Sequence, residues 1–268
     1  MNIGKIVKPS SVEEAFRLLT ADPAAKVLAG GVWLHMTGAD LPLAVDLSGL
    51  GIADIRETRD AWVIGAMTPL SQVEECAGLR SHCGGILPHA VASVMGPGVR
   101  NLATLGGSVM GKFAFSDLMG PLLVLDARLR FHSQPEMTLE AFLSRKEPLR
   151  DLLVEIVIPK GAGGGYFHKI VRTSLDFALL NVAIARFGQK WRIAVGSRPG
   201  IAVRCPEAEA LLAVPNPSEA LLSEAAAKAA SECGCGGNRR ASAEYRRQLA
   251  RTYVGRGLSE VNANANRI

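Results

Sequence analysis

The chain has 268 residues, 48% apolar and 21% charged, which is typical of a globular protein with one large or two modest domains. Only 5% are aromatic, and no run approaches the roughly 20 apolar residues of a transmembrane helix, so we expect neither a stacking surface for single-stranded nucleic acid nor a membrane span. The N-terminus lacks the apolar run of a secretory signal, so we expect a cytoplasmic protein.

The first 52 residues are expected to form a β-α-β unit. Residues 11–14 have capping-box spacing and begin a helix with an apolar face. Residues 26–29 predict a short strand that ends at Gly30-Gly31. A short helix through residues 33–36 and a strand over 43–47 are expected to follow.

From about residue 53 the pattern changes. Residues 52–57 and 62–66 flank a turn and predict a hairpin. The later predicted elements, up to residue 159, are helices at 70–76 and 86–95, a strand through 100–105 closing on Gly106-Gly107, a helix at 118–125, and strands at 128–131 and 152–159.

Residues 161–165, rich in glycine, are the expected linker. Antiparallel strands are then predicted at 166–171, 178–187 and 191–195, and helices from residue 206 onward. The fold class is therefore α+β, with a division near residue 163. Residues 239–268 hold seven arginines and two glutamates, which accounts for the whole net charge of +5. No nucleic-acid motif accompanies this charge, so we expect helical surface and protein contacts, with a merely solvated face as the alternative.

Five cysteines are present, at positions 76, 83, 205, 233 and 235. The Cys233-Gly234-Cys235 spacing invites a metal interpretation, but structural metal sites usually pair two C-x2-C motifs or add histidines. Neither pattern occurs, so we expect reduced thiols in a glycine-rich loop and no metal site.

The two glycine pairs, 30–31 and 106–107, carry the chemistry of the sequence. A bound diphosphate needs several inward-pointing backbone N–H groups with no Cβ in the way, and glycines at strand ends provide this. Neither pair matches G-x-G-x-x-G or the P-loop pattern. The residues alone therefore leave two alternatives, a plain turn or a dinucleotide site.

Longer segments around these glycines resemble a known family. Residues 28–31, followed by 100–107, resemble the paired flavin loops of the FAD-binding subunits of xanthine dehydrogenase and carbon monoxide dehydrogenase. The resemblance continues in order through residues 116–118, 123–127, 167–172 and 242–247.

The resemblance implies a two-lobed FAD-binding domain over 1–163, with lobes of about 1–52 and 53–163, followed by a smaller C-terminal domain of antiparallel sheet and helices over 164–268. The two glycine loops would hold the diphosphate. Asp117 would accept hydrogen bonds from the sugar-alcohol hydroxyls, and Lys169 would lie near the cofactor. The implied cofactor-binding residues are Leu28, Ala29, Gly30, Gly31, Val32, Trp33, Leu34, His35, Thr104, Leu105, Gly106, Gly107, Ser108, Asp117 and Lys169.

The implied function is that of an oxidoreductase subunit with no catalytic residue of its own. In this family, electrons pass from a molybdopterin large subunit through an iron–sulfur small subunit to FAD, and then to NAD or another acceptor. Two alternatives remain open: a family member that has lost FAD and serves as an assembly subunit, and an unrelated flavin oxidase that acts alone.

Some positions depart from the family pattern. Val32 lacks the hydroxyl that is common beside the first loop, and Ser108 replaces the usual Asn. We expect Trp33 to fill the core, with packing on the cofactor as the alternative, and His35 to be a structural or surface residue. Without the resemblance, Asp117 would be interpreted as a helix N-cap and Lys169 as an exposed strand residue.

Overall fold

The computed structural model describes residues 1–265 of the chain. Two compact units can be distinguished in it. Unit 1 comprises Met1–Val73, Gly96–Gly111 and Arg128–Ile158, and unit 2 comprises Glu74–Met95, Lys112–Ala127 and Pro159–Ile268. Both units contain helices and sheet, as the predicted α+β class requires.

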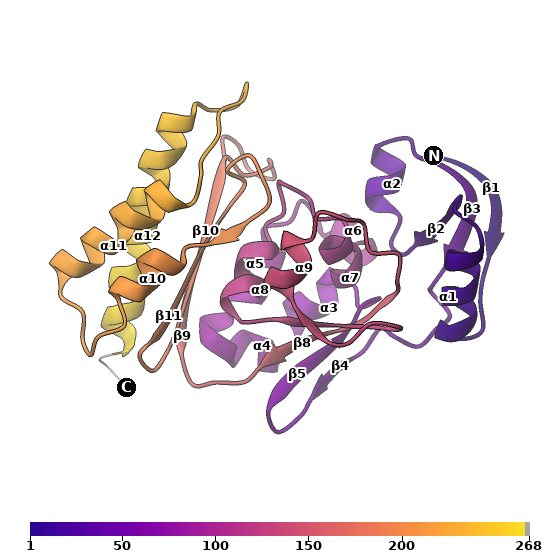
Figure 1. Cartoon of the computed structure of the whole chain (residues 1–268), viewed down its shortest axis with the longest axis horizontal. Helices are drawn as coiled ribbons and strands as arrows, with labels where there is room; N and C mark the ends of the chain where they lie inside the picture. The colour runs from indigo at the N-terminus through magenta and orange to yellow at the C-terminus, as the bar shows by residue number, and fades with distance from the viewer. Residues whose placement is uncertain (266–268) are drawn as a thin grey trace. The chain divides into compact units, whose positions relative to one another are not determined.

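Unit 1 begins with a small parallel sheet of order β1-β3-β2 (Figure 1). Its strands are β1 (Asn2–Val7), β2 (Ala25–Leu28) and β3 (Asp40–Asp46), and its helices are α1 (Val12–Ala21) and α2 (Val32–Met36). The predicted start of α1 is confirmed, because the Ser11 side chain accepts a hydrogen bond from the Glu14 backbone N–H at 3.1 Å. Ala15 and Leu19 are buried on the face of α1 that packs with Ala25 and Val45 of the sheet.

The second sheet of unit 1 has the order β4-β5-β8-β6-β7. Its strands are β4 (Ile55–Glu57), β5 (Ala61–Gly65), β6 (Arg128–Phe131), β7 (Met137–Thr138) and β8 (Leu153–Pro159). The predicted hairpin is confirmed by the antiparallel pairing of β4 with β5, in which Ile55 lies opposite Ile64. The helices that follow these strands in the chain are α3 (Leu70–Glu75), α6 (Pro97–Leu102), α7 (Leu105–Met110) and α9 (Leu139–Ser144).

Unit 2 contains an antiparallel sheet of order β12-β11-β10-β9. Its strands are β9 (Gly164–Ile170), β10 (Leu180–Phe187), β11 (Lys190–Gly196) and β12 (Val203–Arg204). Strand β9 begins inside the predicted linker, because Gly164 and Gly165 pair with Arg186 and Ala185 of β10. Gly165 must lack a side chain there, since a Cβ would lie 2.3 Å from the Cys83 carbonyl oxygen. The last two glycines of the expected linker are therefore sheet residues.

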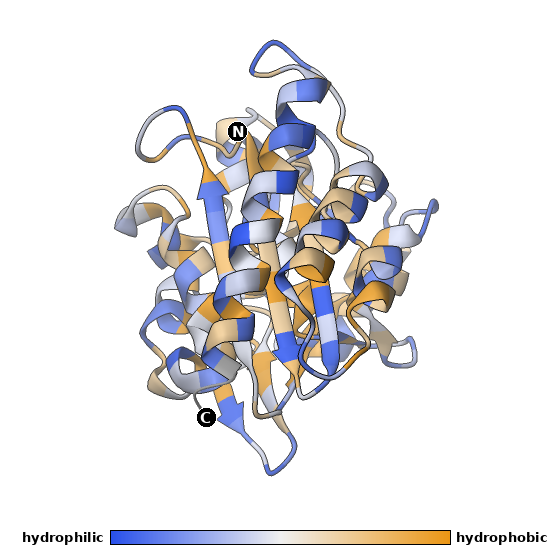
Figure 2. Ribbon diagram, turned by 90° about the vertical axis from the view of Figure 1, so that its left-hand side faces the viewer, coloured by the Kyte–Doolittle hydropathy of each residue, from blue (hydrophilic) through white to orange (hydrophobic). Residues whose placement is uncertain are grey.

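Helices cover both faces of this sheet (Figure 1). They are α4 (Ala77–Ser81), the 3-10 turn His82–Gly85, α5 (Ile86–Ala92), α8 (Met119–Val124), α10 (Pro206–Leu211), α11 (Glu219–Glu232) and α12 (Ala243–Ala265). Helix α12 buries Ala250, Val254, Leu258 and Val261, a helical spacing that places them on one side. In Figure 2, where α10, α11 and α12 face the viewer, these helices carry many hydrophilic residues, and the strands behind them have both hydrophobic and hydrophilic segments.

Candidate functional site

The first glycine loop connects β2 to α2. Gly31 adopts φ +69, a left-handed conformation that favours glycine, and it forms the N-cap of α2. Within residues 1–265, no side chain caps the first turn of this helix by a hydrogen bond. The first N–H groups of a helix have no acceptor inside the helix. This turn is therefore suited to bind an anionic group through its backbone.

The second glycine loop differs from the prediction. Residues 97–102 form α6, and Thr104 is the N-cap of α7, so Gly106-Gly107 lies in the first turn of a helix rather than at a strand end. Pro97 occupies the first turn of α6, a position that proline favours. The predicted strand is wrong because the three apolar residues among 100–105 are too few for periodicity to distinguish helix from strand.

The N–H groups at the start of α7 are already bonded within unit 1. The bonds run from Leu105 N to Thr68 O at 3.0 Å, from Gly106 N to Ala66 O at 2.8 Å, from Gly107 N to Thr104 Oγ1 at 3.1 Å, and from Ser108 N to Thr104 O at 3.0 Å. Ser108 Oγ also donates to Thr104 O, at 3.0 Å. These bonds hold the second loop firmly against β5 and the residues that follow it. The Thr104 hydroxyl can still donate a hydrogen bond, because a hydroxyl group both accepts and donates.

The structure brings the two glycine loops together. A Cβ added at Gly30 would lie 1.8 Å from the Leu102 carbonyl oxygen, so this glycine packs directly on the backbone that leads into the second loop. A Cβ at Gly107 would lie 3.9 Å from the Ala29 Cβ. Residues that are far apart in the sequence therefore form one glycine-lined surface in unit 1.

This surface fits the chemistry of a diphosphate. Around Gly31, a Cβ would meet only the Leu28 side chain, at 3.5 Å, so there is room for a group to approach the backbone. The first loop provides the N–H groups of an uncapped turn, and Thr104 adds a hydroxyl. Backbone N–H donors in a glycine-rich turn are a common means of binding phosphate oxygens.

The side chains of α2 are not part of the core. Trp33 is 36% exposed, so the expectation that it fills the core is wrong. The helix is only five residues long and buries none of its side chains. His35 is exposed, which agrees with a surface histidine.

Asp117 and Lys169 are partners within unit 2. Lys169 Nζ lies 2.7 Å from Asp117 Oδ2, and the two side chains are 10% and 7% exposed. Lys169 also donates to the Ser93 carbonyl oxygen at 2.9 Å. The interpretation of Lys169 as an exposed strand residue is therefore wrong. Asp117 does not cap α8 either, since Leu118 is the N-cap of this helix. The side chain that bonds at this end is that of Ser116, whose hydroxyl accepts a hydrogen bond from the Leu118 backbone N–H at 3.3 Å.

Asn181 of β10 also contacts Asp117, although it was not among the predicted site residues. Its Nδ2 donates to Asp117 Oδ1 and to the Ser116 carbonyl oxygen, both at 3.1 Å. Among the described residues, its buried Oδ1 has no hydrogen-bond partner. The sequence did contain a signal for Asn181, which is an amide within a mostly apolar predicted strand. A buried polar side chain needs hydrogen-bond partners, so such a residue indicates a polar contact.

The pKa of Asp117 reflects two opposing effects. Burial raises the pKa of this carboxyl above its ordinary value, while the charge of Lys169 and the hydrogen bonds from Lys169 and Asn181 lower it. The carboxylate is thus held in a dry environment by a small number of specific partners.

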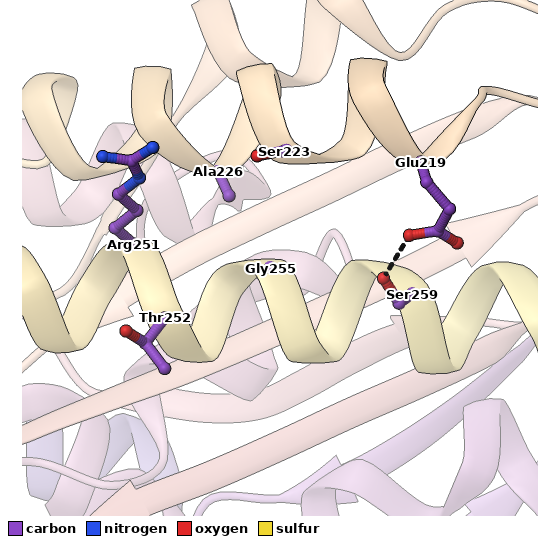
Figure 3. A pocket seen from close by; sticks show the side chains of 7 residues that line it. All are labelled: Glu219, Ser223, Ala226, Arg251, Thr252, Gly255 and Ser259. Carbon is purple, nitrogen blue, oxygen red and sulfur yellow. Dashed lines mark hydrogen bonds between the residues drawn. The ribbon is translucent and has the colours of Figure 1, made fainter.

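A shallow groove lies elsewhere in unit 2, between α11 and α12 (Figure 3). Ser259 Oγ donates to the Glu219 carboxylate at 3.0 Å across it. A Cβ at Gly255 would lie 3.6 Å from Ala226, so small residues allow the two helices to approach closely. None of the predicted site residues lines this groove.

No helix among residues 1–265 is long and apolar enough to cross a membrane. Within the same residues, no group of three or more His, Cys, Asp or Glu side chains is arranged to hold a metal ion.

Comparisons with known proteins identify the family of this chain. Residues 2–161 match the family described as "FAD binding domain in molybdopterin dehydrogenase", and residues 165–261 match "CO dehydrogenase flavoprotein C-terminal domain". The nicotine 6-hydroxylase medium subunit of Paenarthrobacter nicotinovorans is 30% identical, over 97% of both chains. The putative xanthine dehydrogenase FAD-binding subunit of Escherichia coli (strain K12) is 26% identical, over 96% of both.

A solved structure shows the same fold. A chain of the carbon monoxide dehydrogenase from Hydrogenophaga pseudoflava superposes with a TM-score of 0.89 at 25% identity, covering 97% of both chains. This chain therefore belongs to the family of FAD-binding medium subunits of molybdenum hydroxylases of the xanthine dehydrogenase and carbon monoxide dehydrogenase type. It is an oxidoreductase subunit with an FAD-binding domain, so the predicted family, fold class and cofactor are confirmed.

Proposed function

We propose that this chain is the electron-transfer subunit of a molybdenum hydroxylase complex. Electrons would reach its FAD from an iron–sulfur small subunit and leave to NAD or another acceptor, while a molybdopterin large subunit oxidises the substrate. In support, relatives are named as a medium subunit of a hydroxylase and as subunit alpha of a dehydrogenase complex. When bound, FAD supplies the ability to accept electron pairs and to release electrons singly or in pairs.

The observation that carries this proposal is the packing of Gly30 on the backbone that leads into the second glycine loop. That contact supports the proposal that residues 28–35 and 104–108 form one cofactor-binding surface. We propose that the N–H groups of the first loop bind the diphosphate of FAD. The second loop, whose N–H groups are bonded internally, would hold the first in position and contribute the Thr104 hydroxyl.

Asp117 and Lys169 are proposed cofactor residues on the strength of the family resemblance. Lys169 forms an ion pair with one oxygen of the Asp117 carboxylate, and Asn181 donates a hydrogen bond to the other. These contacts support a positioning role for Lys169 and Asn181. A carboxylate held in this way is a suitable acceptor for hydroxyl groups. The lysine would also counter negative charge that accumulates on a reduced flavin.

The choice of acceptor can be tested on the chain loaded with FAD. Under anaerobic conditions, excess NADH should bleach the flavin absorption if NAD is the physiological acceptor, because electron transfer between the two is reversible. Bleaching by dithionite but not by NADH would contradict NAD as the physiological electron acceptor and indicate a different acceptor. With NAD as the oxidant, this chain alone should not oxidise organic substrates.

Two further expectations remain proposals. The division of the chain into domains at residue 163 is proposed from the linker glycines and the family pattern. The cytoplasmic location is likewise proposed from the sequence. Fractionation of the cells that make the complex would test the location directly.

A further inference from the structure

The loop between α11 and α12 holds two cysteines whose sulfur atoms touch. Cys233 Sγ and Cys235 Sγ are 3.4 Å apart, on either side of Gly234. Gly234 has φ +62, and this left-handed turn brings the two side chains to the same side of the loop. Neither thiol has a role in the flavin site proposed above.

The two thiols lie in different environments. Cys233 ends α11 and is 1% exposed, within the apolar core of unit 2. Cys235 is half-buried, and its neighbour Gly234 is exposed. A small oxidant therefore reaches Cys235 first, and Cys233 is positioned behind it.

Arginines surround the loop. Arg198 Nη1 donates to the Gly234 carbonyl oxygen, and Arg246 Nη1 donates to the Gly236 carbonyl oxygen, both at 3.0 Å. The hydrogen bond from Cys233 lowers the pKa of Cys235, and the charges of Arg198 and Arg246 lower it further, against the effect of burial. The same hydrogen bond and burial raise the pKa of Cys233. Exposure and the direction of the pKa shifts both favour Cys235 over Cys233 as the thiol that reacts first.

We propose that Cys233 and Cys235 form a redox-active dithiol that hydroperoxides oxidise reversibly to a disulfide. The Cys235 thiolate attacks the peroxide O–O bond, which gives a sulfenic acid and hydroxide. The Cys233 sulfur then displaces the sulfenic oxygen as water and forms the S–S bond. With hydrogen peroxide as oxidant, two thiols and one peroxide give one disulfide and two waters.

The movement that this reaction requires is small. A disulfide has an S–S length of about 2.05 Å, so the sulfurs must approach by about 1.4 Å. The glycines at 234, 236 and 237 give this loop the backbone freedom to adjust. Thioredoxin-like proteins use Cys-X-X-Cys for the same purpose, and a one-residue spacing closes a smaller ring.

The dithiol loop is connected to the strand that carries Asn181. Arg246 is 1% exposed, and it donates to the carbonyl oxygens of Gly236, at 3.0 Å, and of Leu179, at 2.8 Å. Leu179 lies two residues before Asn181. Closure of the disulfide would shift Gly236 and, through this guanidinium, the start of β10.

The test is peroxide treatment of the full-length, fully reduced chain, followed by alkylation of the remaining thiols and mass spectrometric mapping. We expect the peptide with Cys233 and Cys235 to lose two hydrogens, to escape alkylation, and to recover both thiols after dithiothreitol. Cys235 should also be alkylated at least about tenfold faster than Cys76 at pH 7, since the thiolate is the reactive form. The wild-type chain alone decides both points, whatever the folding of the variants.

Variants assign the roles. In Cys233→Ser, peroxide should leave a sulfenic acid at Cys235 that a dimedone probe captures, and in Cys235→Ser the Cys233 thiol should be unreactive. Cys76→Ser is the matched control and should form the disulfide as the wild type does. Failure of the wild type to form the 233–235 disulfide, or alkylation of Cys235 no faster than that of Cys76, would overturn the proposal.

Discussion

Lys169 and Asp117 form a buried ion pair in unit 2, with 2.7 Å between Nζ and Oδ2. The lysine is on β9 and the aspartate immediately precedes the N-cap of α8. Asn181, opposite Lys169 in the sheet, binds the other oxygen of the carboxylate. Two residues on neighbouring strands therefore fix the carboxylate of Asp117, which is remote from both in the sequence.

Lys169→Met should destabilise the chain strongly. It leaves the Asp117 carboxylate buried without its cation, and breaking a buried pair from one side costs about 3–5 kcal/mol. The measurement is urea unfolding at pH 7. The double variant Lys169→Met/Asp117→Asn removes both charges, so its loss of unfolding free energy should be smaller than the sum of the single losses. Simple additivity would show that the two side chains do not stabilise each other.

Stability should depend on pH through Asp117. Because burial raises the pKa of Asp117, the folded protein keeps a proton that the unfolded chain releases. The free energy of unfolding that this group contributes is complete below the ordinary carboxyl pKa of about 3.9 and is lost as pH rises through the folded pKa. The unfolding free energy of the wild type minus that of Asp117→Asn should therefore fall over this window. A difference that grows with pH would mean that Lys169 dominates and the folded pKa is lowered.

Gly30→Ala should disrupt the contact between the glycine loops. The added Cβ would lie 1.8 Å from the Leu102 carbonyl oxygen, so the backbone must move. We expect a loss of about 1–3 kcal/mol of unfolding free energy, as for other overpacked sites, and a loss of bound FAD. Gly98→Ala is the control, since a Cβ there meets nothing within 4 Å, and it should retain FAD with stability raised by about 0.5–1 kcal/mol. Equal FAD content in both variants would argue against the loop contact as the basis of the site.

Thr104→Ala should separate helix capping from cofactor binding. The side chain caps α7 through Gly107 N at 3.1 Å, and its loss should cost about 1 kcal/mol in a thermal or urea unfolding experiment. Thr138 caps α9 in the same way, through Ala141 N at 3.1 Å, so Thr138→Ala is the matched control. Both should lose similar stability, but only Thr104→Ala should weaken FAD binding in a fluorescence titration. Similar FAD affinity in the two variants would remove Thr104 from the proposed site.

Local signals in the sequence were sufficient for much of the fold. The start of α1 follows from a side-chain cap at Ser11, and the hairpin of β4 and β5 follows from a turn between two apolar runs. Both features depend on residues that are close in the chain. The stretch 100–105 carries no such signal, because its three apolar residues are too few for periodicity to distinguish helix from strand. Its helical structure depends on Pro97 and on the cap at Thr104.

The site was predictable only in part. The glycine pairs and the family resemblance indicated which residues to examine, but the contact of Gly30 with Leu102 joins segments about seventy residues apart. Asn181 was missed because its partners, Ser116 and Asp117, are equally remote in the sequence. Trp33 was misplaced because an aromatic residue in a predicted helix favours burial, whereas α2 is too short to have a buried face.

We propose that this chain binds FAD on the surface formed by its two glycine loops. The visible absorption spectrum of the purified chain, recorded before and after addition of excess FAD and desalting, tests this proposal. We expect flavin bands that correspond to about one FAD per chain in the wild type and in Gly98→Ala, and their loss in Gly30→Ala. A wild-type chain that stays colourless after reconstitution would overturn the proposed FAD site and favour a subunit that has lost FAD and serves in assembly.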